Sequence, residues 1–356
     1  MAIWTEKEIR EALSKGSLKV DPTPKIGEIS IDLSVDKVFK VPQEDFSLLM
    51  KGYYDLHNPF EQGRFSNTME LLGLDNTLSK EIKPCDGKWK LPPDQHASAG
   101  TYMLHYKERF KFNEDIDYSL TKRSSYARCG IAGFSQDNID GHFYDAVLSF
   151  ANNVIYEGDA ISQLTLYDKG TTVLSRKELA GIMGTDELRV FDETSRDFGE
   201  ANELTARIIN PDDDQCCYPF TSYLDLRLHQ KVKAFEGFTI DRKNFNPYDF
   251  MPIDLSIYDQ KYYARFMIGR TRERVKLGPN YAGLLPKCDP IHHSTICYAP
   301  FIKPGSDGVI VTEILPSDPN FGLHHDMIIP LYVVPVKSPV RYQGKFNHQK
   351  EVALPW

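Results

Sequence analysis

Apolar and polar positions along this chain alternate mostly with the spacing of β-strands, and only two short segments have helical spacing. Near the N-terminus, Thr5 can cap a helix with Glu8 three residues later, and Gly16 can end it. A second helix is predicted over residues 175–183, before Gly184. The helices are too few to form a core by themselves, so strands must supply most of it.

The remaining apolar segments favour strands. They are rich in β-branched and aromatic residues, and Gly, Pro, Asn and Asp separate them. The clearest of these segments are residues 29–41, 101–112, 146–150 and 308–315. The sequence therefore predicts a mainly β protein with a few short helices.

Four short sequence segments recur in the same order, and three of the four offsets lie between 163 and 167 residues. This repetition indicates two copies of one β-rich unit. We expect one unit at residues 1–170, a connecting segment with a short helix at 171–215, and a second unit at 216–356. The alternative is that two unrelated β domains share some strand similarity. The matched segments are 31–35 with 224–228, 107–112 with 272–277, 139–140 with 302–303, and 159–164 with 326–331.

Composition narrows the possible functions. The chain has 356 residues, a net charge of −8, 41% hydrophobic and 26% charged residues, which excludes global disorder. The acidic balance argues against a nucleic-acid partner. The longest apolar run, residues 327–336, is about half of what a membrane helix needs, and the N-terminal residues lack a signal-peptide pattern. Six cysteines are too few for a disulfide scaffold, so we expect a cytoplasmic protein with no membrane contact.

The sharpest local motif is a pair of arginines that flank two serines. Arg123, Ser124, Ser125 and Arg128 offer guanidinium forks and hydroxyl groups, which together suit the oxygens of a phosphate. On composition alone, an ordinary surface loop is the better explanation. The surrounding sequence changes this balance.

Residues 123–130 read Arg-Ser-Ser-x-Ala-Arg-x-Gly, Ile-Asp follows at 139–140, and Gly-Asp-x-Ile-x-Gln-Leu at 158–164. This pattern resembles the dCTP deaminase and dUTPase superfamily. The short N-terminal helix followed by residues 30–33 (Ser-Ile-Asp-Leu) is similar to the opening of a dCTP deaminase. The resemblance extends over nearly the whole chain, once per repeat, and is greatest to the long, duplicated form of bacterial dCTP deaminase. It implies two tandem dUTPase-like units of β-barrel or jelly-roll type.

The resemblance also implies roles for single residues. It assigns the triphosphate to the arginine–serine motif, and it places Gln163 near the phosphates. Asp32 is similar to an aspartate that orients magnesium-bound water. We therefore expect Mg²⁺ to enter with the nucleotide, held by phosphate oxygens and water and not by a protein metal site.

The general base of the family is a glutamate ten residues after the Asp of an Ile-Asp-Pro-Gly-Phe motif. In the first repeat this count from Asp140 ends at Phe150, whereas in the second repeat it ends at Glu313. The second repeat has Lys303 in place of the Asp and lacks the Arg-Ser-Ser motif, its matching residues being 285–290. The sequence thus predicts a composite site with the phosphate motif of one repeat and Glu313 of the other. An exposed strand carboxylate is the simpler alternative for Glu313.

This assignment suits hydrolytic deamination of dCTP to dUTP and ammonia. One carboxylate can deprotonate the attacking water and then protonate the departing amine, if burial raises its pKa toward neutrality. A zinc-dependent deaminase is excluded, because the chain has neither His-x-Glu nor Cys-x-x-Cys. Adjacent histidines at 292–293 and 324–325 point to opposite faces of a strand, so a metal site is not expected there.

Two other functions stay open. Asp140 is similar to the water-activating aspartate of dUTPases, so a dUTP pyrophosphatase or a bifunctional enzyme is one alternative. A catalytically silent nucleotide-binding regulator is the other. Tyr342 and Gln343 resemble the Tyr-Gln-Gly segment with which the family closes a tail over the nucleotide, although a disordered tail is an equal alternative. The resemblance further implies dTTP as an inhibitor and a homo-oligomer with sites between units.

Overall fold

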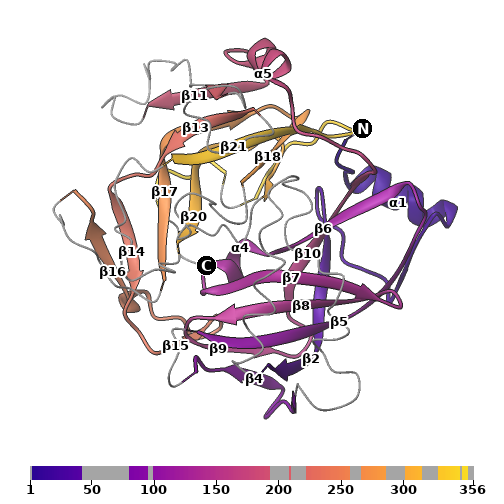
Figure 1. Cartoon of the computed structure of the whole chain (residues 1–356), viewed down its shortest axis with the longest axis vertical. Coiled ribbons are helices and arrows are strands. Elements are labelled where there is room, and N and C mark those ends of the chain that lie inside the picture. The colour runs from indigo at the N-terminus through magenta and orange to yellow at the C-terminus, as the bar shows by residue number, and fades with distance from the viewer. Residues whose placement is uncertain are drawn as a thin grey trace.

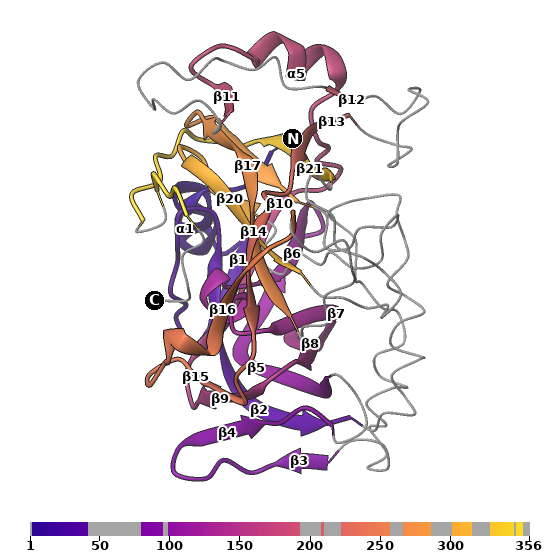
Figure 2. The same cartoon turned by 90° about the vertical axis from the view of Figure 1, so that its left-hand side faces the viewer.

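The structure, a computed structural model, describes residues 2–41, 80–94, 99–192, 208–209, 222–256, 266–285, 301–314, 328–344 and 347–351. It is mainly β with barrel-like sheets, which confirms the predicted fold class. We call residues 2–168 the first half and residues 222–351 the second half. The two halves lie one above the other along the long axis of the molecule (Figure 1, Figure 2).

Both predicted helices are present. Helix α1 (Glu6–Lys15) begins after Thr5, whose backbone N–H donates to the Glu8 carboxylate over 2.9 Å, and it ends at Gly16 with a φ of 75°. Helix α5 (Arg176–Ile182) begins after Ser175 in the same way, with Glu178 as the partner. Among the described residues, no helix has the length and apolar character that a membrane crossing requires.

The first half is built on an eight-stranded antiparallel sheet with the order β6-β10-β2-β5-β8-β7, in which β1 also pairs with β5 and β3 with β2. Its long strands β2 and β5 match two of the predicted segments. The strands are β1 (Leu18–Asp21), β2 (Ile31–Lys40), β3 (Lys80–Ile82), β5 (Gly100–Phe112), β6 (Ile116–Lys122), β7 (Ile131–Ile139), β8 (His142–Ser149) and β10 (Ala160–Asp168).

Two five-stranded antiparallel sheets consist of strands of the second half together with two strands, β11 and β12, that precede it in the chain. One comprises β11 (Leu188–Asp192), β14 (Lys231–Phe235), β16 (Phe250–Asp254), β17 (Met267–Leu277) and β20 (Asp307–Ile314). The other comprises β12 (Ile208–Ile209), β13 (Tyr223–Arg227), β18 (Tyr281–Leu284), β19 (Phe301–Ile302) and β21 (Ile328–Pro335). Strand β11 falls in the segment predicted as a connection and pairs with β17. The exact unit boundaries remain a prediction.

Strand register repeats between the halves. Asp32 of β2 lies opposite Gln163 of β10, and Asp225 of β13 lies opposite Pro330 of β21. These are the positions that the sequence repeat aligns. Since a slip of one residue would turn every side chain to the other face, this shared register is strong support for duplication.

A buried carboxylate marks the same point in both halves. Glu108 accepts a hydrogen bond from the backbone N–H of Ser34 over 2.9 Å, and Glu273 accepts one from that of Arg227 over 2.8 Å. Both glutamates are buried, and burial raises the pKa of Glu108 above its usual value despite the hydrogen bonds from Ser34. The repeat aligns Glu108 with Glu273 and Ser34 with Arg227.

The register corrects one alignment made from the sequence. In β8, Ala146 lies opposite Met103, and in β20, Glu313 lies opposite Ile268. Met103 and Ile268 are equivalent at the repeat offset of β5 and β17, so Ala146, and not Phe150, is the counterpart of Glu313. The reason is a difference in chain length between equivalent points: Ala146 follows Ile139 by seven residues, across a two-residue turn, whereas Glu313 follows Ile302 by eleven residues, across a four-residue connection.

The halves share a core. A three-stranded sheet joins β4 (Lys88–Leu91) and β9 (Asn152–Tyr156) of the first half to β15 (Thr239–Asp241) of the second, which pairs with β9 in parallel. One apolar cluster also contains residues of both halves, among them Cys129 and Ala146 from the first and Phe235 and Phe266 from the second. The two halves are therefore held in a fixed relation by shared sheet and core contacts.

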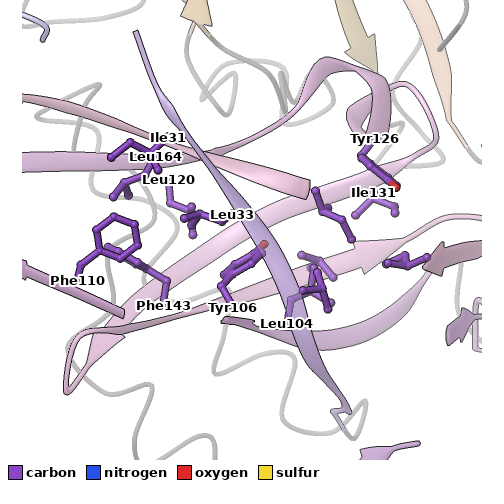
Figure 3. Close-up of a cluster of buried hydrophobic side chains, with 14 of the residues drawn as sticks. Ile31, Leu33, Leu104, Tyr106, Phe110, Leu120, Tyr126, Ile131, Phe143 and Leu164 are labelled. Carbon is purple, nitrogen blue, oxygen red and sulfur yellow. The ribbon is translucent and has the colours of Figure 1, made fainter. Parts of the chain in front are cut away.

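The interior of the first half combines an apolar core with a buried ion pair. The apolar side chains that converge include Ile31, Leu33, Leu104, Phe110, Leu120, Phe143 and Leu164 (Figure 3). Beside them, Lys122 contacts Asp145, and its Nζ lies 2.8 Å from Ser162 Oγ. The Tyr106 hydroxyl donates to Asp145 over 2.8 Å. Burial lowers the pKa of Lys122, against the opposing charge of Asp145.

Replacing Lys122 with Met should lower the free energy of unfolding by about 3–5 kcal/mol, because it leaves the Asp145 charge buried without its cation. The measurement is the urea unfolding midpoint at neutral pH. The double variant Lys122→Met/Asp145→Leu should recover much of the loss. A Lys122→Met protein that unfolds within about 1 kcal/mol of the parent would contradict this role of the pair.

Candidate functional site

The arginine–serine motif forms a tight turn after the end of β6. Arg123 is extended, helix α4 (Ser124–Ala127) makes a single turn, and Arg128 follows it. The turn ends at Gly130, whose φ of 72° is in the left-handed region that favours glycine. At Gly130 a Cβ atom would lie 2.6 Å from the Phe266 ring of the second half, so the close approach also requires glycine.

Three sequence-predicted residues meet beside this turn. The Arg123 guanidinium donates to the Asp32 carboxylate over 3.2 Å, and Lys25 Nζ lies 3.7 Å from the same oxygen. Gln163 lies opposite Asp32 on the adjacent strand, and its side-chain oxygen accepts from the Ser30 hydroxyl over 3.2 Å. Strand pairing between β2 and β10 thus places Asp32 and Gln163 beside the Arg123–Arg128 turn.

The opposite side of the site belongs to the second half. Alternate residues of β20, namely Val309, Val311 and Glu313, face the same way because side chains alternate along a strand. The Glu313 side chain is buried, with only 1% of the residue exposed. The strand therefore presents one buried carboxylate beyond two apolar side chains.

A cavity of about 400 Å³ lies between the two halves and joins these elements. Seven of the ten residues predicted from the sequence line it. The first half supplies Asp32, Arg123, Ser124, Arg128 and Gln163, and the second half supplies Glu313 and Tyr342. Figure 1 shows α4 and β20 near the middle of the molecule. Residues from both repeats thus line one cavity of a single chain, and their roles in a composite site stay a prediction.

Three predicted residues do not line the cavity. Asp140 is exposed at the tip of the turn between β7 and β8, where its carbonyl accepts from Arg109 Nε over 2.9 Å. Ser125 is part of α4, and its carbonyl accepts a hydrogen bond from the Cys129 thiol over 3.1 Å. Gln343 is exposed. The segment 286–290 and the histidine pairs at 292–293 and 324–325 lie outside the described residues.

Lys303 is a lining residue whose role the sequence did not predict. Its Nζ lies 2.6 Å from the Glu28 carboxylate and 5.1 Å from the centre of the Tyr342 ring. Partial burial opposes ionisation of Glu28, but the hydrogen bond and charge of Lys303 outweigh it and lower the pKa of Glu28. The only sign of this role in the sequence was that Lys303 replaces the Asp of the family's Ile-Asp-Pro-Gly-Phe motif.

The C-terminal tail also contributes to the wall. Its backbone lies against Gly305 and Gly308, where a Cβ atom would come within 2.8 Å of the tail backbone in each case. The Tyr342 N–H donates to the Pro304 carbonyl over 2.9 Å, and the Val309 N–H to that of Gln349 over 2.9 Å. Two glycines at the start of β20 therefore let the tail pack directly against this strand.

Chemically, the two halves contribute unlike groups to the cavity. The first half supplies two arginines, a serine hydroxyl and an amide, and these groups suit phosphate oxygens. The second half supplies a buried carboxylate and valine side chains, a combination suitable for proton transfer. Within the described part of the chain, no three His, Cys, Asp or Glu side chains are grouped to hold a metal ion.

Comparison with known proteins agrees with these features. A family model described as dCTP deaminase-like matches residues 3–169. The chain is 26% identical over 174 residues to a dCTP deaminase, dUMP-forming, of Methanosphaera stadtmanae, which covers 46% of this chain and 78% of that protein.

Among solved structures, the 2′-deoxycytidine 5′-triphosphate deaminase of Agrobacterium tumefaciens is similar with a TM-score of 0.63 and 17% identity. The alignment covers 94% of this chain and 99% of that chain, so the likeness in fold includes both halves. Motifs, family model and fold thus agree: the first half of the chain, residues 3–169, belongs to the dCTP deaminase/dUTPase superfamily, and the whole chain has a fold similar to that of the Agrobacterium protein.

Proposed function

We propose that this protein hydrolyses dCTP to dUTP and ammonia in the cavity between its halves. The observation that carries the proposal is that one cavity contains both the Arg123–Arg128 turn and the buried carboxylate of Glu313. Neither half alone has both groups. The names of the Methanosphaera and Agrobacterium relatives support dCTP as the substrate.

The triphosphate would bind at the α4 end. Arg123 and Arg128 would neutralise phosphate charge with bidentate hydrogen bonds, and Ser124 would add a hydroxyl donor. Mg²⁺ would enter with the nucleotide as part of the substrate, where Asp32 is placed to accept from its bound water. This orientation directs the cytosine ring toward β20.

Glu313 would then act on water and on the leaving group in turn. The carboxylate takes a proton from water as the oxygen bonds to C4 of cytosine, and it gives that proton to the 4-amino nitrogen. The C4–N bond breaks, ammonia leaves, and the proton of the new C4 hydroxyl moves to N3, which gives the carbonyl and the N3–H of uracil. No oxidant or second substrate is needed. The valines beside Glu313 would limit the access of other water molecules.

The pyrophosphatase alternative has less support. The Methanosphaera relative is named for dUMP formation, and the sequence around Asp140 resembles that around the water-activating aspartate of dUTPases. Here Asp140 is exposed and is not among the lining residues, and the equivalent position within the cavity is Lys303. We therefore propose dUTP as the released product. Inhibition by dTTP, assembly into a homo-oligomer and a cytoplasmic location remain proposals from the resemblance.

Replacing Glu313 with Gln should lower kcat for ammonia release from dCTP by about 10²–10⁴-fold, with KM within a few-fold of the parent, because it removes the proton carrier and keeps the shape. Ammonia and separated nucleotides are measured with dCTP and Mg²⁺. The exposed Glu157→Gln is the matched control. Full deaminase turnover by Glu313→Gln would show that another group is the base.

The same incubation separates the alternatives. Under the deaminase proposal the parent protein yields dUTP, and Asp140→Asn leaves the rate unchanged. If the parent protein yields dUMP and pyrophosphate, and Asp140→Asn yields neither, the enzyme is bifunctional instead. Binding of dCTP with neither ammonia nor pyrophosphate would identify a nucleotide-binding regulator.

Replacing Arg123 with Ala should raise KM for dCTP about 10–100-fold, since a charge-assisted hydrogen bond to phosphate contributes about 1.5–3 kcal/mol. Arg123→Lys should be intermediate, because lysine keeps the charge and loses the planar fork. Initial rates over a range of dCTP concentrations give both constants. An unchanged KM in Arg123→Ala would exclude a phosphate-binding role for this residue.

A further inference from the structure

A segment of the second half packs on the first half beside the phosphate turn. Strand β15 pairs in parallel with β9, with Thr239 opposite Asn152 and Asp241 opposite Val154, and the two strands lie side by side in Figure 1. The Asn152 amide also donates to the Thr239 hydroxyl over 3.1 Å. The residues that follow β15 therefore have a fixed place relative to the first half.

Arg242, the next residue after β15, contacts the turn itself. Its guanidinium carbon lies 5.0 Å from the centre of the Tyr126 ring, a distance at which a cation is attracted by the ring face. Tyr126 is a member of α4, is 1% exposed, and is not among the residues that line the cavity. Arg242 thus reaches the phosphate turn through a buried side chain that the substrate would not touch.

Tyr126 connects this contact to a second element of the site. Its hydroxyl donates to the Asp159 carboxylate, which also accepts from the Tyr156 N–H over 3.2 Å. Asp159 directly precedes β10, the strand that carries Gln163. Arg242 therefore contacts a ring whose hydroxyl group connects the Arg123–Arg128 turn to strand β10.

The far end of the turn is held by the second half as well. The Phe266 ring packs on Gly130, and Phe266 directly precedes β17. Two residues later, Ile268 lies opposite Glu313 in the β17–β20 pair. The second half thus contacts this turn at two points, at Tyr126 and at Gly130. Because Glu313 is in the second half, the distance from the turn to Glu313 depends on these contacts between the halves.

We infer that Arg242 is a positioning residue, which orients the phosphate turn through Tyr126 and so couples the packing of the halves to triphosphate binding. This inference rests on the proposed function for its substrate. A merely structural contact would stabilise the protein without discriminating between ligands. A positioning residue affects ligands that carry the triphosphate and leaves those without it unchanged.

The neighbouring Lys243 provides a matched control. Its Nζ lies 3.4 Å from the centre of the Tyr156 ring, so it makes the same kind of contact from the same segment. Lys243 contacts a different ring, outside α4. Loss of Lys243 therefore tests whether any weakened contact between the halves is enough to change nucleotide binding.

The experiment compares Arg242→Ala, Arg242→Lys and Lys243→Ala, each in the Glu313→Gln background, where turnover does not consume the ligand. The dissociation constants of dCTP with Mg²⁺ and of deoxycytidine are measured by calorimetry, with the thermal midpoint of each protein. Arg242→Ala should weaken dCTP binding about 3–30-fold, the range expected for a cation–π contact, with deoxycytidine unchanged. Arg242→Lys should retain most of the affinity, and Lys243→Ala should match the parent.

Equal losses for dCTP and deoxycytidine, equal losses in Arg242→Ala and Lys243→Ala, or no loss at all would each overturn the inference. If Arg242→Ala does not fold, Arg242→Gln, which keeps length without charge, takes its place with the same expected result. A parent protein that binds dCTP and releases no ammonia refutes only the proposed function. A protein with Glu313 intact that binds no dCTP refutes both.

Discussion

The packing of one half on the other is the constraint on which the rest of the site depends. The cationic turn is in the first half and the buried carboxylate of Glu313 is in the second, so neither is useful unless their separation is fixed. Sheet pairing between β9 and β15, the shared apolar cluster and the contact of Phe266 with Gly130 all act on this separation. Because protein interiors are close-packed, small shifts at such contacts are resisted.

The two halves share a framework and differ in chemistry. Glu108 and Glu273 accept equivalent backbone hydrogen bonds, and the registers at Asp32 and Asp225 agree. At the position of Glu313 the first half has Ala146, a small residue in the shared apolar cluster. The same position thus has a buried carboxylate in one half and a small packing side chain in the other.

Local signals in the sequence predicted a large part of this structure. Capping residues located α1 and α5, β-branched runs located β2, β5 and β20, and the arginine–serine motif located the turn at α4. The predicted counterpart of Glu313, Phe150, was wrong by four residues, because the length of a loop in one repeat does not give its length in the other. The contacts of Lys303 with Glu28 and Tyr342, and of Arg242 with Tyr126, join residues far apart in sequence, so only the folded chain reveals them.

Because one chain supplies both walls of the cavity, mutations can change the two walls independently. In an assembly of identical subunits, every substitution appears on both sides of every interface at once. Here a substitution in one half leaves the other half untouched, so the Arg123–Arg128 turn and the strand of Glu313 can be altered separately. Asymmetric variants of the site, which a symmetric assembly would require two genes to produce, are therefore available through single mutations.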